Sequence, residues 1–421
     1  MAGSSLAPLR YAPFRLLVAG RTVTMLGNAV APIALAFAVL DLTGSVRDLG
    51  LVVGARSLAN VLFLLAGGVI ADRFPRHLVM VAASGSAAVT QAVVATAVLT
   101  GTATIPLLAG LAAVNGMVSA FAFPASSALL PQTVPAQIRQ QANAISRLGF
   151  NAGTIAGAAA GGVLVALVGP GWGLAVDAAT FAIAAACFGL VQVPDVRDRT
   201  AGRQHVLADL REGWTAFAGR TWLWVVVVGF LFFNAAYAAV LGVLGPAVAD
   251  QTIGRGAWGL VLAAQTTGMV VGAVVALRLR VRRLLLFGVV GIGTATLLPV
   301  ALALAPQVAV LLAAAFLGGL GIEQFGVAWE TSMQEHIPAD RLARVYSYDA
   351  LGSFVAIPAG QVSAGPTALA IGTDPTLLAG AGILALAVVG MLASREVRGL
   401  AHHPPPLTAG RRRRPGARAA E

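Results

Sequence analysis

The sequence predicts an all-α membrane protein whose twelve transmembrane helices form two pseudo-symmetric six-helix halves, and three observations lead to this class. Hydrophobic residues make up 58% of the 421 positions and charged residues only 11%, whereas about a quarter of a soluble domain is charged. Apolar stretches of roughly 20 residues, the length that crosses a bilayer, recur along the chain. A weak internal repeat relates the first half of the chain to the second.

The apolar stretches and the polar turns between them define the spans. In chain order they are Leu16–Leu40, Leu49–Ile70, Leu78–Leu99, Ile105–Leu130, Ala142–Val168, Gly173–Val191, Trp222–Val248, Trp258–Leu277, Leu284–Leu304, Val308–Trp329, Val345–Ile371 and Leu377–Ala393. The longest polar stretch, Val193–Arg220, follows the sixth span. We therefore divide the chain into an N-terminal half (1–192), a cytoplasmic linker (193–220), a C-terminal half (221–394) and a basic, disordered tail (395–421).

Arginine placement predicts the orientation of the helices. Most arginines, among them Arg10, Arg139 and Arg344, fall on the same side as both termini and the linker, and the other side has only Arg47 and Arg255. Cytoplasmic loops of membrane proteins are enriched in basic residues. We therefore expect a multi-pass protein of the cell membrane, monomeric and in contact with lipid, with both termini cytoplasmic.

The internal repeat rests on three pairs of short motifs at nearly one offset. The pairs are centred on Gly68 and Gly272, Pro135 and Pro338, and Gly169 and Gly372, with offsets of 204, 203 and 203 residues. Any one of these matches could arise by chance, but a common offset implies two parallel six-helix halves.

Composition also excludes several functions. The chain has a net charge of +11 and no lysine, so it lacks the Walker A lysine that ATP-driven transport requires. One cysteine, Cys187, provides neither a disulfide framework nor a Cys-based metal site. Five histidines show no catalytic or metal-ligating spacing, so we expect no enzymatic activity, cofactor or metal. The Arg411–Arg414 run indicates contact with anionic lipid, and we expect no nucleic-acid partner.

A charged turn lies between the second and third spans, from Gly68 to His77. Its Asp72, Arg73 and Arg76 cannot lie in hydrocarbon, so the turn must be interfacial. The pattern Gly-x3-Asp-Arg-x2-Arg resembles the loop between the second and third helices of the major facilitator superfamily. Pro75 replaces a glycine of that pattern. The resemblance implies that this loop takes part in gating.

Further motifs, in order and spacing, resemble the macrolide-efflux and enterobactin-exporter-like branch of that superfamily. They are Phe14-Arg15-Leu16, Leu42-Thr43-Gly44-Ser45, Phe123-Pro124-Ala125, Leu130-Pro131, Asp177-Ala178 with Phe181, and Arg341-x2-Arg344-Val345. This resemblance implies a twelve-helix secondary transporter that exports small molecules.

A ladder of glycines marks the fifth span. Gly149, Gly153, Gly157 and Gly161 recur every four residues, as in the glycine-rich motif of antiporters, although Ala158 stands where that motif has proline. The alternative is close packing of helices, for which small residues at this spacing are sufficient.

Ionisable groups inside the spans are the candidates for coupling transport to protons, because charges in a membrane are costly. Arg21 in the first span and Glu323 in the tenth are the leading pair, since these helices line the central cavity in the family. Arg56 and Asp177 lie at similar depth, and a structural ion pair is the favoured interpretation for them. We expect Asp349 to cap the eleventh span or to pair with the charged turn.

Softer polar and aromatic residues are candidates for a substrate cavity, with cross-linking of helices as the alternative for each buried amide. They are Asn28, Asn115, Phe230, Phe233, Asn234, Tyr237, Gln265, Gln324 and Trp329. We predict a secondary transporter that exports small amphipathic molecules, such as drugs or secondary metabolites, by proton antiport with alternating access. The alternatives are a siderophore exporter, an importer of the same fold, and a non-transporting membrane sensor or assembly protein.

Overall fold

The computed structural model describes residues 6–73, 75–193, 217–276, 278 and 281–401. Within these ranges, the side chains of residues 65–73, 76, 123–125, 127–128, 136, 339–340 and 343–344 are outside the description. Every element of the described chain is helical, which confirms the predicted all-α class. Most of the linker and residues 402–421 lie outside the described residues.

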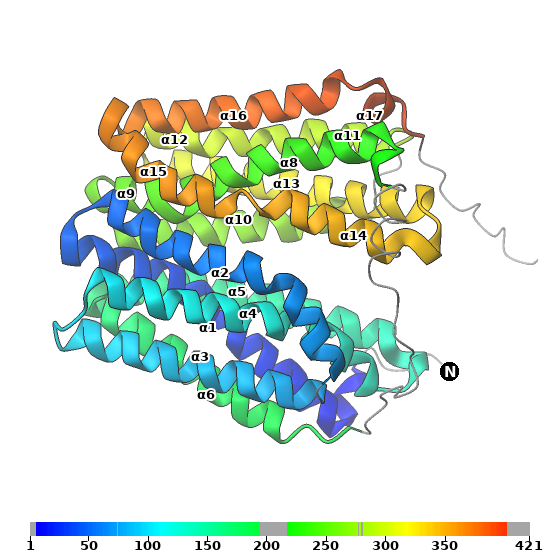
Figure 1. Cartoon of the computed structure of the whole chain (residues 1–421), viewed down its shortest axis with the longest axis horizontal. Coiled ribbons are helices and arrows are strands. Elements are labelled where there is room, and N and C mark those ends of the chain that lie inside the picture. The colour runs from blue at the N-terminus through cyan, green and yellow to red at the C-terminus, as the bar shows by residue number, and fades with distance from the viewer. Residues whose placement is uncertain (1–5, 74, 194–216, 277, 279–280, 402–421) are drawn as a thin grey trace, which may run out of the picture.

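Six long helices form the N-terminal half (Figure 1). They are α1 (Ala12–Thr43), α2 (Val46–Arg73), α3 (Arg76–Leu99), α4 (Ile105–Leu129), α5 (Arg139–Val168) and α6 (Pro170–Gly189), with short 3-10 turns at Ala7–Arg10, Leu130–Gln132 and Ala136–Ile138. Within this half, α1 packs against α5 and α6, α2 against α4, and α3 against α4 and α6.

The C-terminal half contains more interruptions. Its elements are α8 (Thr221–Ala239), a π turn (Val240–Leu244), α9 (Gly245–Gln251), α10 (Arg255–Ala276), α11 (Leu284–Ile292), a 3-10 turn (Gly293–Thr296), α12 (Leu297–Leu304), α13 (Val308–His336), α14 (Ala339–Phe354), α15 (Ile357–Ile371), α16 (Thr373–Ala393) and α17 (Arg395–Gly399). In the described chain eleven helices or continuous helix pairs are long and apolar enough to cross a membrane, and α2 accounts for the twelfth predicted span.

Prolines explain the interruptions of the C-terminal half. Pro246 follows the π turn and Pro299 follows the 3-10 turn, each by a few residues, and Pro358 follows the break between α14 and α15. A proline lacks the backbone N–H and clashes with the carbonyl four residues earlier, so it disturbs the helix just before it. The predicted span Val345–Ile371 is confirmed as one membrane-crossing segment, and a short turn between Phe354 and Ile357 divides it into the end of α14 and α15.

Two glycines related by the predicted repeat have the same conformation. Gly169 joins α5 to α6 with φ 91° and ψ 165°, and Gly372 joins α15 to α16 with φ 93° and ψ 157°. A positive φ of this size favours glycine over every other residue. The 203-residue offset between Gly169 and Gly372 in the sequence thus relates two turns of the same backbone conformation.

The beginning of the predicted tail is ordered. Arg395–Gly399 forms α17, which is capped by the Ser394 hydroxyl accepting from the Val397 N–H at 3.4 Å. The Glu396 carboxylate accepts from the Trp222 N–H at 3.0 Å and ties α17 to the start of α8. The expectation of disorder was therefore wrong for these residues, because a side-chain cap and a carboxylate at a helix N-terminus are stabilising.

Candidate functional site

The two halves share one hydrophobic core at one end of the bundle. Buried residues of both halves, including Phe37, Leu49, Val240 and Trp258, form a single cluster there. At the opposite end the buried residues separate into one cluster of the C-terminal half and another of the N-terminal half. We call these the joined end and the open end. Figure 1 shows α2 beside α15 toward the joined end and a widening separation toward the chain's N-terminus.

Glycines bring the helices of the two halves into contact at the joined end. A methyl group added to Gly162 of α5 would lie 2.7 Å from the Cα of Gly259 in α10, and one added to Gly50 of α2 would lie 2.5 Å from the Gln361 carbonyl of α15. Such distances leave no room for a side chain. The contact between halves therefore depends on glycine at these positions.

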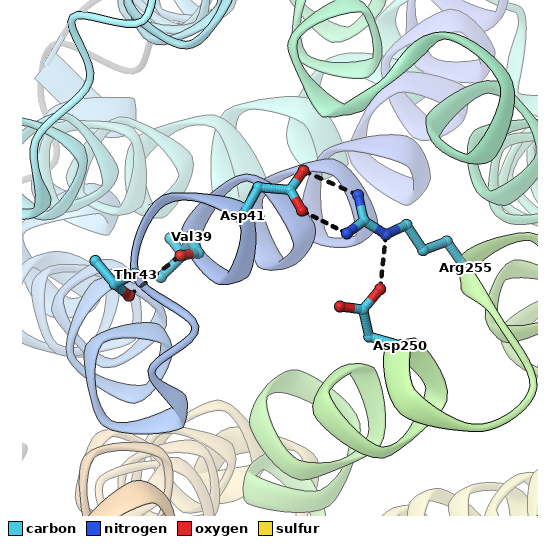
Figure 2. A network of polar contacts seen from close by, with 5 residues as sticks. All are labelled: Val39, Asp41, Thr43, Asp250 and Arg255. Atoms are coloured by element: carbon cyan, nitrogen blue, oxygen red, sulfur yellow. Dashed lines mark hydrogen bonds and ion pairs between the residues drawn. The ribbon is translucent and has the colours of Figure 1, made fainter.

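An ionic network also links the halves at the joined end (Figure 2). Arg255 at the start of α10 donates to both carboxylate oxygens of Asp41 near the end of α1, at 2.9 Å for the Nη1–Oδ2 bond, and its Nε donates to Asp250 Oδ1 at 2.7 Å. The guanidinium also lies 4.9 Å from the ring centroid of Phe37 on α1. Bidentate pairing and cation–π contact are the geometries in which arginine binds best.

The sequence predicted Arg21 as a coupling residue and Asn28 as a cavity residue, and both are half-buried on one face of α1. This helix contacts α5 through Thr22 and Leu26 and α6 through Gly20 and Gly27. Residues seven apart share a face, and the face of Arg21 and Asn28 is directed away from both neighbours. No described residue forms a hydrogen bond or ion pair with Arg21.

Glu323 is half-buried on α13, beside α10. A methyl group added to Gly272 of α10 would lie 3.0 Å from the Glu323 Cβ. The charges that act on Glu323 are those of Arg147 on α5 and Glu330 on its own helix. The sequence predicts Arg21 as the basic partner of Glu323 and gives no sign of Arg147, which lies in the same predicted span as the glycine ladder.

Arg56 and Asp177 belong to a buried polar network inside the N-terminal half. Arg56 Nε donates to Asn115 Oδ1 at 3.1 Å, and Gln91 Nε2 donates to the fully buried Asp177 at 2.5 Å. Arg56 and Asp177 attract each other without a direct ion pair. Asp177 Oδ1 and Asn115 Nδ2 are buried with no hydrogen-bond partner among the described residues.

Aromatic rings form a continuous series along α8 and α13. Phe230 stacks on Phe233 at 5.3 Å and on Phe325 at 4.3 Å between ring centroids, and Tyr237 and Trp329 extend the series at its two ends. Phe233, Phe325 and Trp329 are buried, whereas Phe230 is half-exposed. Phe325 was missed in the sequence, although it lies four residues before Trp329 and therefore on the same face.

Two of the predicted cavity amides cross-link helices. Asn234 Nδ2 donates to the Ser353 carbonyl at 2.9 Å and ties α8 to α14, and Gln324 Nε2 donates to the Gly272 carbonyl at 2.5 Å and ties α13 to α10. The Tyr237 hydroxyl is buried near Gln265 without a well-formed hydrogen bond. Bonds between helices occupy these amides in the described structure.

The charged turn Gly68–His77, predicted to take part in gating, is described only in part. Helix α2 ends at Arg73 and α3 begins at Arg76, which agrees with a tight turn, and the side chains of Gly68, Asp72, Arg73 and Arg76 lie outside the described residues.

Asp349 lies in the interior of α14 and not at its start, so the capping interpretation was wrong. Its carboxylate accepts from Trp329 Nε1 at 3.1 Å and from the Ser353 hydroxyl at 3.2 Å. The bond from Trp329 ties α14 to the aromatic series on α13, and the bond from Ser353 lies within α14.

Comparison with known proteins agrees with this architecture. The solved structure of the nucleoside transporter NupG is similar at a TM-score of 0.72 and 13% identity, covering 90% of this chain and 98% of that one. A bacterial homolog of the human lysosomal transporter Spinster, inward-facing and unoccupied, has a TM-score of 0.71 and 16% identity over 93% and 98%. A D-xylose-proton symporter has 0.70 and 15% over 90% and 97%.

At these identities the solved structures show the fold alone. No curated protein matches this chain in sequence. The sequence model of the Major Facilitator Superfamily matches residues 17–357, which is most of the chain and runs from α1 through α14. The members of this family are transporters and not enzymes. The chain, with two six-helix halves joined at one end, belongs to the Major Facilitator Superfamily.

Proposed function

We propose that this protein exports small amphipathic molecules by proton antiport, with alternating access between its two halves. The observation that carries the proposal is the contrast between the ends: one core spans both halves at the joined end, and each half has its own core at the open end. Packed interfaces have discrete arrangements rather than a continuous range. A second state in which the ends exchange roles would complete the cycle.

Glu323 is the proposed proton site. It is a half-buried carboxylate inside a span, on the side of the open end, and the charge of Arg147 of the other half favours its ionised form. Ionisable residues inside membrane proteins mark ion and proton pathways. Asp177 is the reserve candidate, but its complete burial and its bond to Gln91 favour a structural role.

The proposed cargo is an amphipathic molecule with an aromatic or apolar body. Phe230 is the half-exposed member of the aromatic series and can offer a ring face to such a body. Ligand sites are mostly apolar with a few polar groups, and Arg21 and Asn28 on α1 provide polar groups. The resemblance to macrolide-efflux and enterobactin-exporter-like permeases supports this cargo class.

The proposed orientation follows from the arginine distribution. Both termini and the linker face the cytoplasm, so the open end, which lies on the side of the chain's N-terminus, faces inward (Figure 1). The protein is proposed to reside in the cell membrane as a monomer. The Gly68–His77 turn then lies at the cytoplasmic surface, where it can gate the movement of the two halves.

Reconstituted vesicles with an imposed pH gradient test the function. A panel of cationic, neutral and anionic aromatic amphiphiles is offered, and accumulation is measured with and without a protonophore. We expect at least one panel member to accumulate against its gradient, and the protonophore to abolish this. Protein-dependent accumulation that the protonophore leaves unchanged would contradict proton coupling, and a panel without any protein-dependent flux would contradict export of amphiphiles.

A further inference from the structure

Helices α5 and α10 run antiparallel across the boundary between the halves. The Ala158 carbonyl lies near Gly259, whereas the Ala166 side chain lies near Gly256. Residue numbers along the contact therefore rise in α5 as they fall in α10. From the contact of Gly162 with Gly259, Arg147 is about 22 Å along α5 and Gly272 about 20 Å along α10, toward the open end. The two positions are therefore at matching depth.

The helical phase of α5 directs Arg147 toward the C-terminal half. Arg147 precedes Ala158 by three helical turns, so the two residues share a face, and Ala158 contacts α10 through its carbonyl. Gly149 and Gly153, by contrast, contact α1. The Arg147 side chain is exposed, and it forms no hydrogen bond or ion pair within the described chain.

The charges around Glu323 come from several neighbouring elements. Helix α10 carries only Arg255, at its far end, whereas Arg278, Arg282 and Arg283 follow its near end, and Leu284–Leu304, which covers α11 and α12, carries no ionisable residue. Helix α13 itself contributes Glu330, Glu335 and His336. The described ionisable groups of α14 are Arg341, Tyr346, Tyr348 and Asp349, of which Asp349 is bonded to Trp329. Among the basic groups, Arg147 has the clearest electrostatic influence on Glu323.

We propose that Arg147 is the positioning residue through which the ionisation of Glu323 sets the state of the open end; this rests on the proposed function. Ionised Glu323 attracts Arg147 of the opposite half and draws the open end closed. When Glu323 binds a proton, the attraction is lost and this end opens again. Attraction between opposite charges that approach each other is enough to change the ratio of two states.

This order of events matches proton antiport. A carrier that has taken a proton from outside returns to the inward-open state, because neutral Glu323 no longer holds the open end closed. Release of the proton to the cytoplasm restores the attraction, and the carrier, now with cargo, closes this end. A charge pair between halves thus links protonation to conformation without any contact between proton and cargo.

Distance measurements between spin labels test the proposal without any cargo. Labels are attached at Asn143→Cys on α5 and Gly326→Cys on α13, both exposed, in full-length protein with Cys187→Ser, held in lipid nanodiscs. We expect a short distance at about pH 9, a long one at about pH 5, and a change of about tenfold in the ratio of the two populations. Arg147→Gln and Glu323→Gln should keep the long distance at both pH values.

Two further variants complete the test. Arg147→Lys keeps the charge and should keep the pH response, and Arg139→Gln, which removes an exposed arginine from the same helix, should keep it too. A full pH response in Arg147→Gln, or its equal loss in Arg139→Gln, would overturn the proposal. Because no transport is measured, a failure here is distinct from a failure of export in vesicles.

Discussion

Arg255 of α10 donates hydrogen bonds to both carboxylate oxygens of Asp41 on α1, so a bidentate ion pair fastens the two halves together at the joined end. Asp250 shares the guanidinium and Phe37 lies beneath it. Because Asp41 is 43% exposed, water weakens the pair, and its contribution is of the order of 1 kcal/mol. In an alternating-access cycle this pair must break each time the joined end opens.

Arg255→Gln should therefore favour opening of the joined end. We expect the population with this end open to rise by about two- to fivefold, measured by spin-label distances across this end. Asp41→Asn in the same chain should add little, because its partner is already gone. Arg47→Gln, which removes an exposed arginine from the same side, is the matched control, and an equal effect there would argue against the pair.

Gly162→Ala should weaken the joined end more than Gly256→Ala. A methyl group at Gly162 would meet the Gly259 Cα at 2.7 Å, whereas one at Gly256 would have its nearest neighbour at an ordinary 3.8 Å. Overpacking of this kind typically costs about 1–3 kcal/mol. Thermal unfolding and distances across the joined end measure the effect, and equal behaviour of the two variants would contradict the close contact.

Glu323→Gln should abolish export driven by a pH gradient and leave exchange of cargo between the two sides intact. The amide keeps the shape of the side chain but cannot release a proton. Vesicle flux with and without the gradient separates the two activities. Glu330→Gln, one heptad away and exposed, should export normally. If Glu323→Gln pumps at the wild-type rate, the proton site lies elsewhere, with Asp177 next to be tested.

Asp72→Asn should slow transport while the protein still folds and inserts. The predicted role of Asp72 is attraction to a helix N-terminus at the cytoplasmic gate, worth about 0.3–2 kcal/mol depending on burial. Export rates at equal surface expression measure the effect. A wild-type rate would remove the gating role from this carboxylate.

A reporter fused after Ala393 should be active only in the cytoplasm. The reason is the excess of arginine on the side of both termini. Activity of a periplasmic or extracellular reporter at this position would reverse the proposed orientation, and with it the assignment of the open end.

The sequence by itself determined the fold class, the pairing of the two halves and the sites of the main turns. Apolar stretches long enough to cross a bilayer can only be helices or barrel strands, and the offset that joins Gly169 to Gly372 recurs as one backbone conformation. The sequence also offered close helix packing as one reason for the glycine ladder of α5, and Gly149, Gly153 and Gly157 do contact α1.

Only the tertiary structure decided which charges face each other. The charge of Arg147, and not that of Arg21, influences Glu323 in the structure, because the antiparallel contact of α5 with α10 brings these two positions to matching depth. The ion pair of Arg255 with Asp41 joins positions 214 residues apart in the sequence. A sequence shows the depth of a charge within its own helix, but the partner of that charge depends on how neighbouring helices pack.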